Sequence, residues 1–486
     1  MLTKDTIEIL KSLSKEELKR FGDFIKSPYF NTSKPIEKIF DSVHKVYPEF
    51  LGNSLNHDKI FKKLYPAEEF NEKRIKNLYS EFSNLLKKFL GHERLANNKM
   101  QMDVNVTTEL TDRDLYKISE KLIAKSIKDN DDRLLSIADR FHYVYPLNVN
   151  HTHNLGYLRE YGSPEYLQSD IKLIEKLVIF YLTNILQLSF YDTMNHKIFT
   201  MDENPILKVA ADSIDTEKIL SYLKSTNHEY ASYLKIHYLF HYYSKHDISE
   251  EKYIELKEEI FGTIRKVKKN DQNQFIFRMI HMIISKLSIN SRKYYEDVIE
   301  FAELLDELKI FPDENINAFS NGPFRDIFIT AIALKKYDWA ESFVNKYIQY
   351  MGKDVKVDTE NFCRGILNFK RGNFEDSLSY FNEVKMIDIV EKLNVRFYYM
   401  MNYIELKSYE SALSALHSFK QFTHDSEIIP EMFANRVNES LKYFAEIIKC
   451  AEKGEKPDEW LYKEALANKG IIHKQYITEK MESMMS

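Results

Sequence analysis

The sequence predicts an all-α protein, and three observations lead to that prediction. The chain of 486 residues contains only 12 glycines and 11 prolines, although all-β folds and nucleotide-binding α/β folds need many of both for their turns. Apolar residues recur with helical spacing along most of the chain. No segment alternates apolar and polar residues for long enough to propose a sheet.

Composition and charge exclude several classes of protein. A hydrophobic fraction of 44% with a mean hydropathy of -0.45 excludes a disordered chain and a multi-span membrane protein. The net charge of -5, from 69 basic and 74 acidic residues, gives no overall attraction to nucleic acid or acidic lipid. The first residues lack an apolar stretch behind a basic start, so no secretory signal is expected. The most apolar stretch, 177–191, is too short and too polar to span a bilayer, which predicts a buried helix in a cytoplasmic protein.

The first 92 residues are expected to form one compact N-terminal helical unit. Ser14 followed by Glu17 makes a capping box, and the helix behind it must end before Pro28. A second helix is expected after Ser33, which can cap it, and Asn71 caps a long helix with a regular apolar face. A short helix over 58–64 lies between them.

Three further regions follow this unit. The polar, weakly periodic stretch 93–111 is predicted to be a linker or irregular helix, and 112–320 an irregular array of helical hairpins. The remaining residues, 321–486, are predicted to form helical repeats with C-terminal capping helices. Breaks between helices are expected at 146–162, 204–205, 247–249, 312, 321–323 and 457.

Internal similarity is the most specific signal in the sequence. Three segments align, namely KKYDWAESFVNKY from Lys335, GNFEDSLSYFNEV from Gly372 and KSYESALSALHSF from Lys407. Each places an aromatic residue three positions before a small one, in the pairs Tyr337–Ala340, Phe374–Ser377 and Tyr409–Ala412. The small residues recur 37 and then 35 residues apart, close to the period of helix-pair repeats. A small side chain lets the second helix of a pair approach the first, while the aromatic ring fills the turn.

These segments resemble the tetratricopeptide repeat, and GNFEDSLSYFNEV is the best match. The resemblance implies stacked helix pairs with a concave groove, and Gly365 falls where the first helix of that family has its small residue. Polar or aromatic residues stand where the family has bulky apolar ones, either because the first helices are rotated by about one residue or because the repeats are divergent. In the aligned register six of them form one stripe that is predicted to bind a partner, namely Asn361, Arg364, Asn368, Arg396, Tyr399 and Tyr403.

A second resemblance covers the whole chain. The segments LSKEELKRFGDFIKSPYFN and FKKLYPAEEFN, together with the C-terminal repeats, look like a group of long hypothetical proteins from Bacteroidetes-like bacteria. That group has no established activity, so the resemblance implies an architecture and a bacterial lineage only.

Residues that could carry chemistry are few. The sequence has no G-x-x-x-x-G-K-[ST], G-x-G-x-x-G, G-x-S-x-G or H-E-x-x-H motif, which predicts a protein without catalytic residues, cofactor or metal. His237 and His241 lie four apart on one helical face among aromatic residues, and His151 and His153 are placed in a polar loop. Both pairs are interpreted as structural or hydrated, with a metal site at His237 and His241 kept as an alternative. Two cysteines form neither a disulfide framework nor a metal-ligand pattern.

The N-terminal unit carries an excess of positive charge. Residues 1–99 hold 19 basic and 14 acidic residues. The run from Asp58 to Leu90 is similar to the second and third helices of winged-helix regulators, without a recognisable hairpin wing. Its basic residues include Lys73, Arg74, Lys76, Lys87 and Lys88. Because acidic residues are interleaved, a solvated helix face is the preferred interpretation, with nucleic-acid binding as the alternative.

The sequence therefore favours a non-enzymatic scaffold or adaptor that binds a peptide or helix of a partner protein on a concave helical surface. The alternative is a nucleic-acid-binding or regulatory protein that uses its basic N-terminal unit, with the repeats as a sensor or oligomerisation module.

Overall fold

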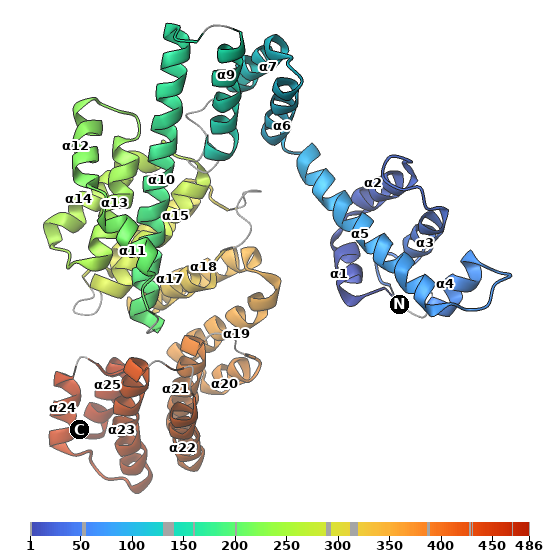
Figure 1. Cartoon of the computed structure of the whole chain (residues 1–486). Helices are drawn as coiled ribbons and strands as arrows, with labels where there is room; N and C mark the ends of the chain where they lie inside the picture. The colour runs from blue at the N-terminus through green and yellow to red at the C-terminus, as the bar shows by residue number, and fades with distance from the viewer. Residues whose placement is uncertain are drawn as a thin grey trace. The chain divides into compact units, whose positions relative to one another are not determined.

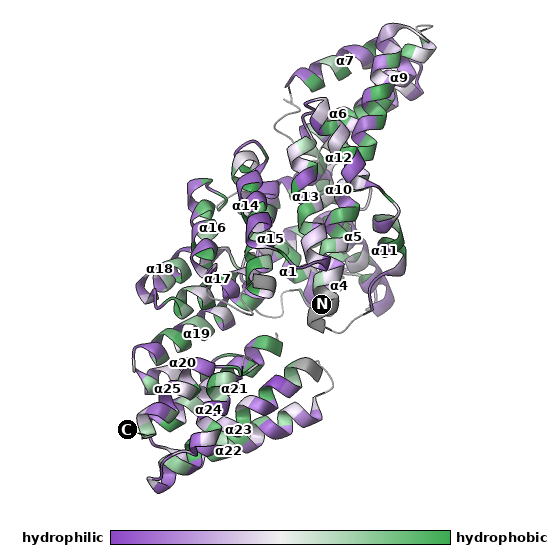
Figure 2. Ribbon diagram, turned by 90° about the vertical axis from the view of Figure 1, so that its left-hand side faces the viewer, coloured by the Kyte–Doolittle hydropathy of each residue, from purple (hydrophilic) through white to green (hydrophobic). Residues whose placement is uncertain are grey.

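The structure is a computed structural model of the chain, shown in Figure 1. It describes residues 2–50, 55–129, 140–158, 161–199, 202–287, 293–311, 319–385, 389–426, 429, 431–468 and 470–485. Within these ranges there are 24 α-helices and no strand, apart from one isolated bridge between Phe319 and Met351. The prediction of an all-α protein is confirmed. Hydrophobic and hydrophilic residues mix along most helices (Figure 2), as expected of amphipathic helices that cover a core.

The chain divides into two compact units, which are described separately. The first comprises residues 1–129 and 143–170, and the second comprises 130–142 and 171–486. The helices of the first unit are α1 (Lys4–Ser12), α2 (Lys15–Lys26), α3 (Lys34–His44), α4 (His57–Leu64), α5 (Glu72–Ala96), α6 (Lys99–Asp112), α7 (Tyr116–Asp129) and α9 (Tyr145–Tyr157). A short π-helix, Arg140–Val144, precedes α9.

Residues 2–89 share one hydrophobic core inside the first unit. The predicted capping box is present, since the Glu17 amide donates to Ser14 Oγ at 3.2 Å and the Ser14 amide donates to Glu17 Oε2 at 2.7 Å. Asn71 caps α5 by accepting from the Arg74 amide at 2.9 Å. Each cap gives a hydrogen-bond partner to an amide group that has none within the helix. The predicted starts of α2 and α5 are therefore confirmed.

The stretch 93–111 is helical over most of its length, in the last turn of α5 and in α6. Helices α6, α7 and α9 surround a small core of Val104, Ile123 and Leu147. Buried polar side chains supplement it: Thr111 Oγ1 donates to Asn154 Oδ1 at 3.0 Å. The weak apolar periodicity of this region reflects a core that is held largely by hydrogen bonds.

The predicted break at 146–162 is wrong, because α9 occupies most of it. His151 and His153 therefore lie on a helix rather than in a loop, and His151 Nδ1 lies 2.7 Å from Glu120 Oε2 of α7. Asparagine, threonine and histidine lower helix propensity when summed over this segment. Hydrogen bonds between α9 and α7 stabilise the helix in spite of this low helix propensity.

Helix α10 (Pro164–Phe199) runs from the first unit into the second. The stretch Pro164–Met194 is long and apolar enough to cross a membrane by length and composition, with a mean hydropathy of 1.4 in its best window. The sequence argument that 177–191 is too short does not hold, because the helix continues on both sides. Its second half nevertheless packs into a protein core through Ile179, Leu182, Leu186, Phe190 and Met194. A core helix satisfies the same test of length and apolarity.

The second unit holds the remaining helices around one large core. They are α11 (Pro205–Asp212), α12 (Thr216–Ser225), α13 (Ala231–Lys245), α14 (Glu250–Ile264), α15 (Lys269–Met282), α16 (Tyr295–Glu307), α17 (Asn321–Ala333), α18 (Tyr337–Tyr347), α19 (Lys353–Lys370), α20 (Phe374–Asn382), α21 (Ile389–Glu405), α22 (Tyr409–Asp425), α23 (Glu431–Lys453), α24 (Glu459–Ala467) and α25 (Lys474–Met485). A π-helix, Ile283–Leu287, and a 3₁₀-helix, Ile348–Tyr350, complete the set. The breaks predicted at 247–249 and 457 fall between helices. Those at 204–205 and 321–323 lie at the starts of α11 and α17, and residue 312 lies outside the described residues.

Helices α17 to α22 form three successive hairpins with the same turn (Figure 1). In each turn one residue is left-handed, namely Lys335 at φ 60°, Gly372 at φ 84° and Lys407 at φ 57°. The next amide then donates to a carbonyl five residues earlier, at 2.8 to 2.9 Å. This bond closes the end of the first helix in each of the three hairpins.

The small residues predicted to lie between the paired helices are fully buried. Ala340, Ser377 and Ala412 are each 0% exposed. In the middle hairpin, Ser377 Oγ donates to the Gly365 carbonyl at 2.8 Å and accepts from Asn402 Nδ2 at 3.0 Å. One hydroxyl thus connects α19, α20 and α21.

Titratable groups also lie inside the second unit. Arg278 is 1% exposed, and its Nη1 lies 2.9 Å from Nδ1 of His237, which is equally buried. Burial and the neighbouring Arg278 charge hold the pKa of His237 well below its ordinary value. Burial, assisted by Lys245, lowers the pKa of His241 from 6.5 to about 4.

The close approach of α19 and α20 predicts that Gly365→Ala destabilises the protein. An added Cβ would lie 2.8 Å from Cε1 and Cζ of the buried Phe381 ring, which costs about 1–3 kcal/mol of unfolding free energy. Gly262→Ala on α14 is the matched control, because nothing lies within 4 Å of the added carbon and alanine favours a helix by about 0.5–1 kcal/mol. Urea denaturation measures both, and equal stabilities would contradict the close packing.

The left-handed residue in each turn predicts that glycine gives higher stability there than a residue with a side chain. Lys335→Gly and Lys407→Gly should each raise the free energy of unfolding by up to about 1 kcal/mol, because a side chain is strained in this conformation. Gly372→Ala should lower it by a similar amount. Thermal unfolding of the three variants tests this, and a loss of stability in the two lysine variants would refute the shared turn.

The buried His241 predicts a loss of stability in acid. Below pH 6.5 the unfolded chain binds a proton at this residue, whereas the folded chain resists protonation until about pH 4. The free energy of unfolding should therefore fall between pH 7 and pH 5, with about 2 kcal/mol contributed by His241. Urea denaturation at both pH values should show a smaller fall for His241→Leu than for the unmodified chain, with the exposed His417→Gln as control. An unchanged fall in His241→Leu would contradict the assignment.

Candidate functional site

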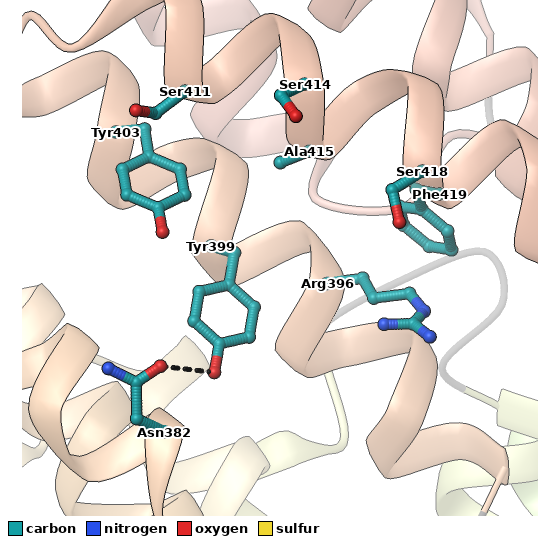
Figure 3. A pocket seen from close by; sticks show the side chains of 9 residues that line it. All are labelled: Asn382, Arg396, Tyr399, Tyr403, Ser411, Ser414, Ala415, Ser418 and Phe419. Atoms are coloured by element: carbon teal, nitrogen blue, oxygen red, sulfur yellow. Dashed lines mark hydrogen bonds between the residues drawn. The ribbon is translucent and has the colours of Figure 1, made fainter.

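The candidate site is a cavity of about 460 Å³ that the third hairpin forms with the end of α20. Figure 3 shows Arg396, Tyr399 and Tyr403 in a row along α21, facing α22. The remaining lining residues are Asn382 of α20 and, on α22, Ser411, Ser414, Ala415, Ser418 and Phe419. The volume lies in the range of small-ligand pockets.

The cavity exists because α22 carries small side chains where its counterparts carry large ones. Three positions after the buried small residue, α22 has Ala415, whereas α18 has Phe343 and α20 has Tyr380. Six positions after it, α22 has Ser418, whereas α20 has Glu383. The missing side-chain volume on α22 is left as open space.

Among the described residues, no acidic side chain pairs with the charge of the cavity. Arg396 is the one charged residue among the nine that line it. Its guanidinium lies 4.0 Å from the centroid of the Phe422 ring, and its Nε is buried without a hydrogen-bond partner in the described part of the chain. Burial lowers the pKa of Arg396, since removal of water disfavours the charged form. A desolvated cation of this kind favours an anionic ligand.

Hydroxyl groups surround that cation. Ser411, Ser414 and Ser418 are exposed at the rim, and within the described residues none of their hydroxyls makes a hydrogen bond. Tyr399 and Tyr403 stack with ring centroids 6.3 Å apart, and burial raises the pKa of Tyr399, which keeps its phenol protonated. The cavity therefore offers donors and two aromatic walls around one positive charge.

The structure separates the six predicted partner-binding residues into two groups. Arg396, Tyr399 and Tyr403 line the cavity. Asn361, Arg364 and Asn368 lie on α19, outside it. There Arg364 pairs with Glu360 at 2.8 Å, and Asn368 Nδ2 donates to the Arg364 carbonyl at 2.9 Å.

Two asparagines and three serines belong to this region although the sequence analysis did not select them. Arg364 Nη2 donates to Asn345 Oδ1 at 3.1 Å, and Tyr399 Oη donates to Asn382 Oδ1 at 2.9 Å. Asn345 and Asn382 occupy the same column of the aligned repeat segments, so the alignment already held the signal. The serines could have been found in the same way, as a run of small residues on the third segment.

The other candidate residues form no comparable site. His237 Nδ1 accepts from the Arg278 guanidinium, a cation that opposes metal binding at that nitrogen. In the described ranges no group of three or more His, Cys, Asp or Glu side chains could hold a metal ion. Cys363 and Cys450 are buried, and burial raises the pKa of both thiols, that of Cys450 to about 11.

The basic run of the N-terminal unit is partly neutralised. Arg74 pairs with Glu68 at 2.6 Å and Lys76 pairs with Glu72 at 2.7 Å. The other lysines of the run, Lys73, Lys87 and Lys88, are exposed without an ion pair to any described residue.

Comparisons with known proteins add no assignment. No protein-family model, curated protein or solved structure matches the chain. The two resemblances stated from the sequence therefore stay predictions, and the function has to be inferred from the side chains described above.

Proposed function

We propose that the chain is a non-enzymatic scaffold or adaptor that binds a peptide or helix of a partner protein on its helical hairpins. The observation that carries this proposal is the cavity of the third hairpin, where Arg396 has no ion-pair partner in the described part of the chain and lies beside two stacked tyrosines. Arginine and tyrosine are enriched among residues that dominate binding energy at protein interfaces.

The proposal includes a tetratricopeptide-like solenoid as the architecture of the repeat region. Three hairpins share one turn and one buried small residue, which is the packing that helix-pair repeats require. We also propose that the chain belongs to the group of long bacterial proteins that its whole sequence resembles.

The chemistry favours binding over catalysis. Neither thiol is activated, because burial raises both pKa values. The proposed protein needs no metal and no cofactor to bind a peptide.

We place the protein in the cytoplasm and not in a membrane. Both cysteines are free thiols, as is usual in a reducing compartment. The second half of α10 contributes to the core of the second unit, which favours a core helix over a membrane span.

Nucleic-acid binding through the N-terminal unit is the alternative. It is favoured by the exposed Lys73, Lys87 and Lys88, and it is weakened by the ion pairs of Arg74 and Lys76 with their acidic neighbours.

Affinity purification from the native cells tests the proposal. The tagged chain should recover one protein in near-equal amount, with or without nuclease. Arg396→Gln should reduce that recovery by about tenfold or more, as expected for an arginine at the centre of an interface. Arg364→Gln is the matched control, because Glu360 already pairs with Arg364.

Two outcomes would count against the scaffold. Partners that disappear after nuclease treatment would favour the N-terminal unit and nucleic acid instead. Absence of a protein partner under either condition would remove the adaptor proposal.

A further inference from the structure

We propose that the cavity between α21 and α22 binds the carboxylate of an acidic side chain in a partner peptide, with Arg396 as its counter-ion and the α22 serines as hydroxyl donors. This inference rests on the proposed function and specifies the chemistry of its ligand. The proposed binding surface comprises Tyr399 of α21, Ser418 of α22 and Asn382 at the end of α20.

The repeat itself shows how a neighbouring arginine is neutralised. In the preceding hairpin the Arg364 guanidinium pairs with the Glu360 carboxylate at 2.8 Å, one turn away on α19. The residue four positions before Arg396, at the same spacing, is Lys392, a second cation. Arg396 therefore lacks the carboxylate that its own helix could have supplied.

The second helix of the third hairpin, α22, also lacks a carboxylate at the position that corresponds to Glu383. Glu383 follows the small residue of α20 by six positions, and the equivalent residue of α22 is Ser418, which lines the cavity. A partner carboxylate would thus supply the charge that a glutamate at position 418 could have supplied internally.

The charge balance favours a carboxylate over a phosphate. The lining holds a single positive charge and no negative one, which matches a monoanion. A phosphomonoester carries close to two negative charges at neutral pH, so one of them would stay uncompensated. Phosphate sites in proteins commonly gather several cations or backbone amides.

The geometry suits a side chain that enters from solvent. The three serines lie one helical turn apart along α22, with Ser411 in its first turn, where the helix dipole favours negative charge. In Figure 3 Arg396 lies near Ser418, and its Nε is buried. The faces of Tyr399 and Tyr403 offer apolar contact for the methylene groups of the entering side chain.

A defined probe tests this inference on the full chain. The probe is a fluorescein-labelled peptide of ten glutamates, followed by fluorescence anisotropy at physiological salt, with the matched peptide of ten glutamines as control. We expect the glutamate peptide to bind and the glutamine peptide to bind at least about tenfold more weakly. Arg396→Gln should weaken the glutamate peptide by about tenfold, while Arg364→Gln should change its affinity less than about twofold.

A pair of substitutions separates charge from shape without removing the arginine. Ser418→Glu places in α22 the carboxylate that α20 has at Glu383, so it should pair with Arg396 and prevent binding of the probe. Ser418→Gln has a similar size and no charge, and it should retain binding within about threefold. Equal loss in the two variants, or equal loss in the two arginine variants, would overturn the inference. Stronger competition by inorganic phosphate than by acetate at equal concentration would also overturn it.

The outcomes distinguish this inference from the scaffold proposal. A protein partner that Arg396→Gln retains, together with a probe that does not bind, would leave the scaffold proposal standing without a carboxylate site. Binding of the probe with no protein partner in the purification would support the anion site and remove the scaffold.

Discussion

The Ser377 hydroxyl is the interaction on which the repeat region depends. It donates to the Gly365 carbonyl and accepts from the Asn402 side chain, so it fixes three consecutive helices at close range. Only a small residue on α20 and a glycine on α19 allow that approach, and the Phe381 ring then packs directly on the glycine. Because Ser377 is fully buried, its two hydrogen bonds have no competition from water.

The same spacing in the third hairpin has a different consequence. Ala412 replaces the serine and keeps the helices close, while the outer positions of α22 shrink to serine and alanine. A fixed backbone with smaller side chains cannot collapse fully, so it leaves a cavity. The proposed binding surface therefore arises from a local decrease of side-chain volume on α22.

The sequence predicted the helices whose limits depend on local interactions. Ser14, Asn71 and the aligned turn residues act within a few positions of themselves, so their roles can be inferred from a short window. The helix at His151 was missed because buried contacts with α7 stabilise it, and such contacts are invisible in a window. The six predicted residues fall into two groups for a local reason that the sequence does contain: Glu360 lies one turn before Arg364 and pairs with it, whereas Lys392 stands one turn before Arg396.

An unpaired, half-buried arginine lowers the stability of the free protein, since its lost hydration is not replaced. On α19, Glu360 supplies such a charge to Arg364 one turn away, whereas Lys392 stands at that spacing before Arg396. A ligand that supplies the missing charge restores the lost interaction only in the folded state, and therefore stabilises that state by mass action. In the proposed site, binding and stability would thus be coupled at Arg396. That coupling distinguishes a recognition site from a surface arginine, whose pairing contributes little to stability in either state.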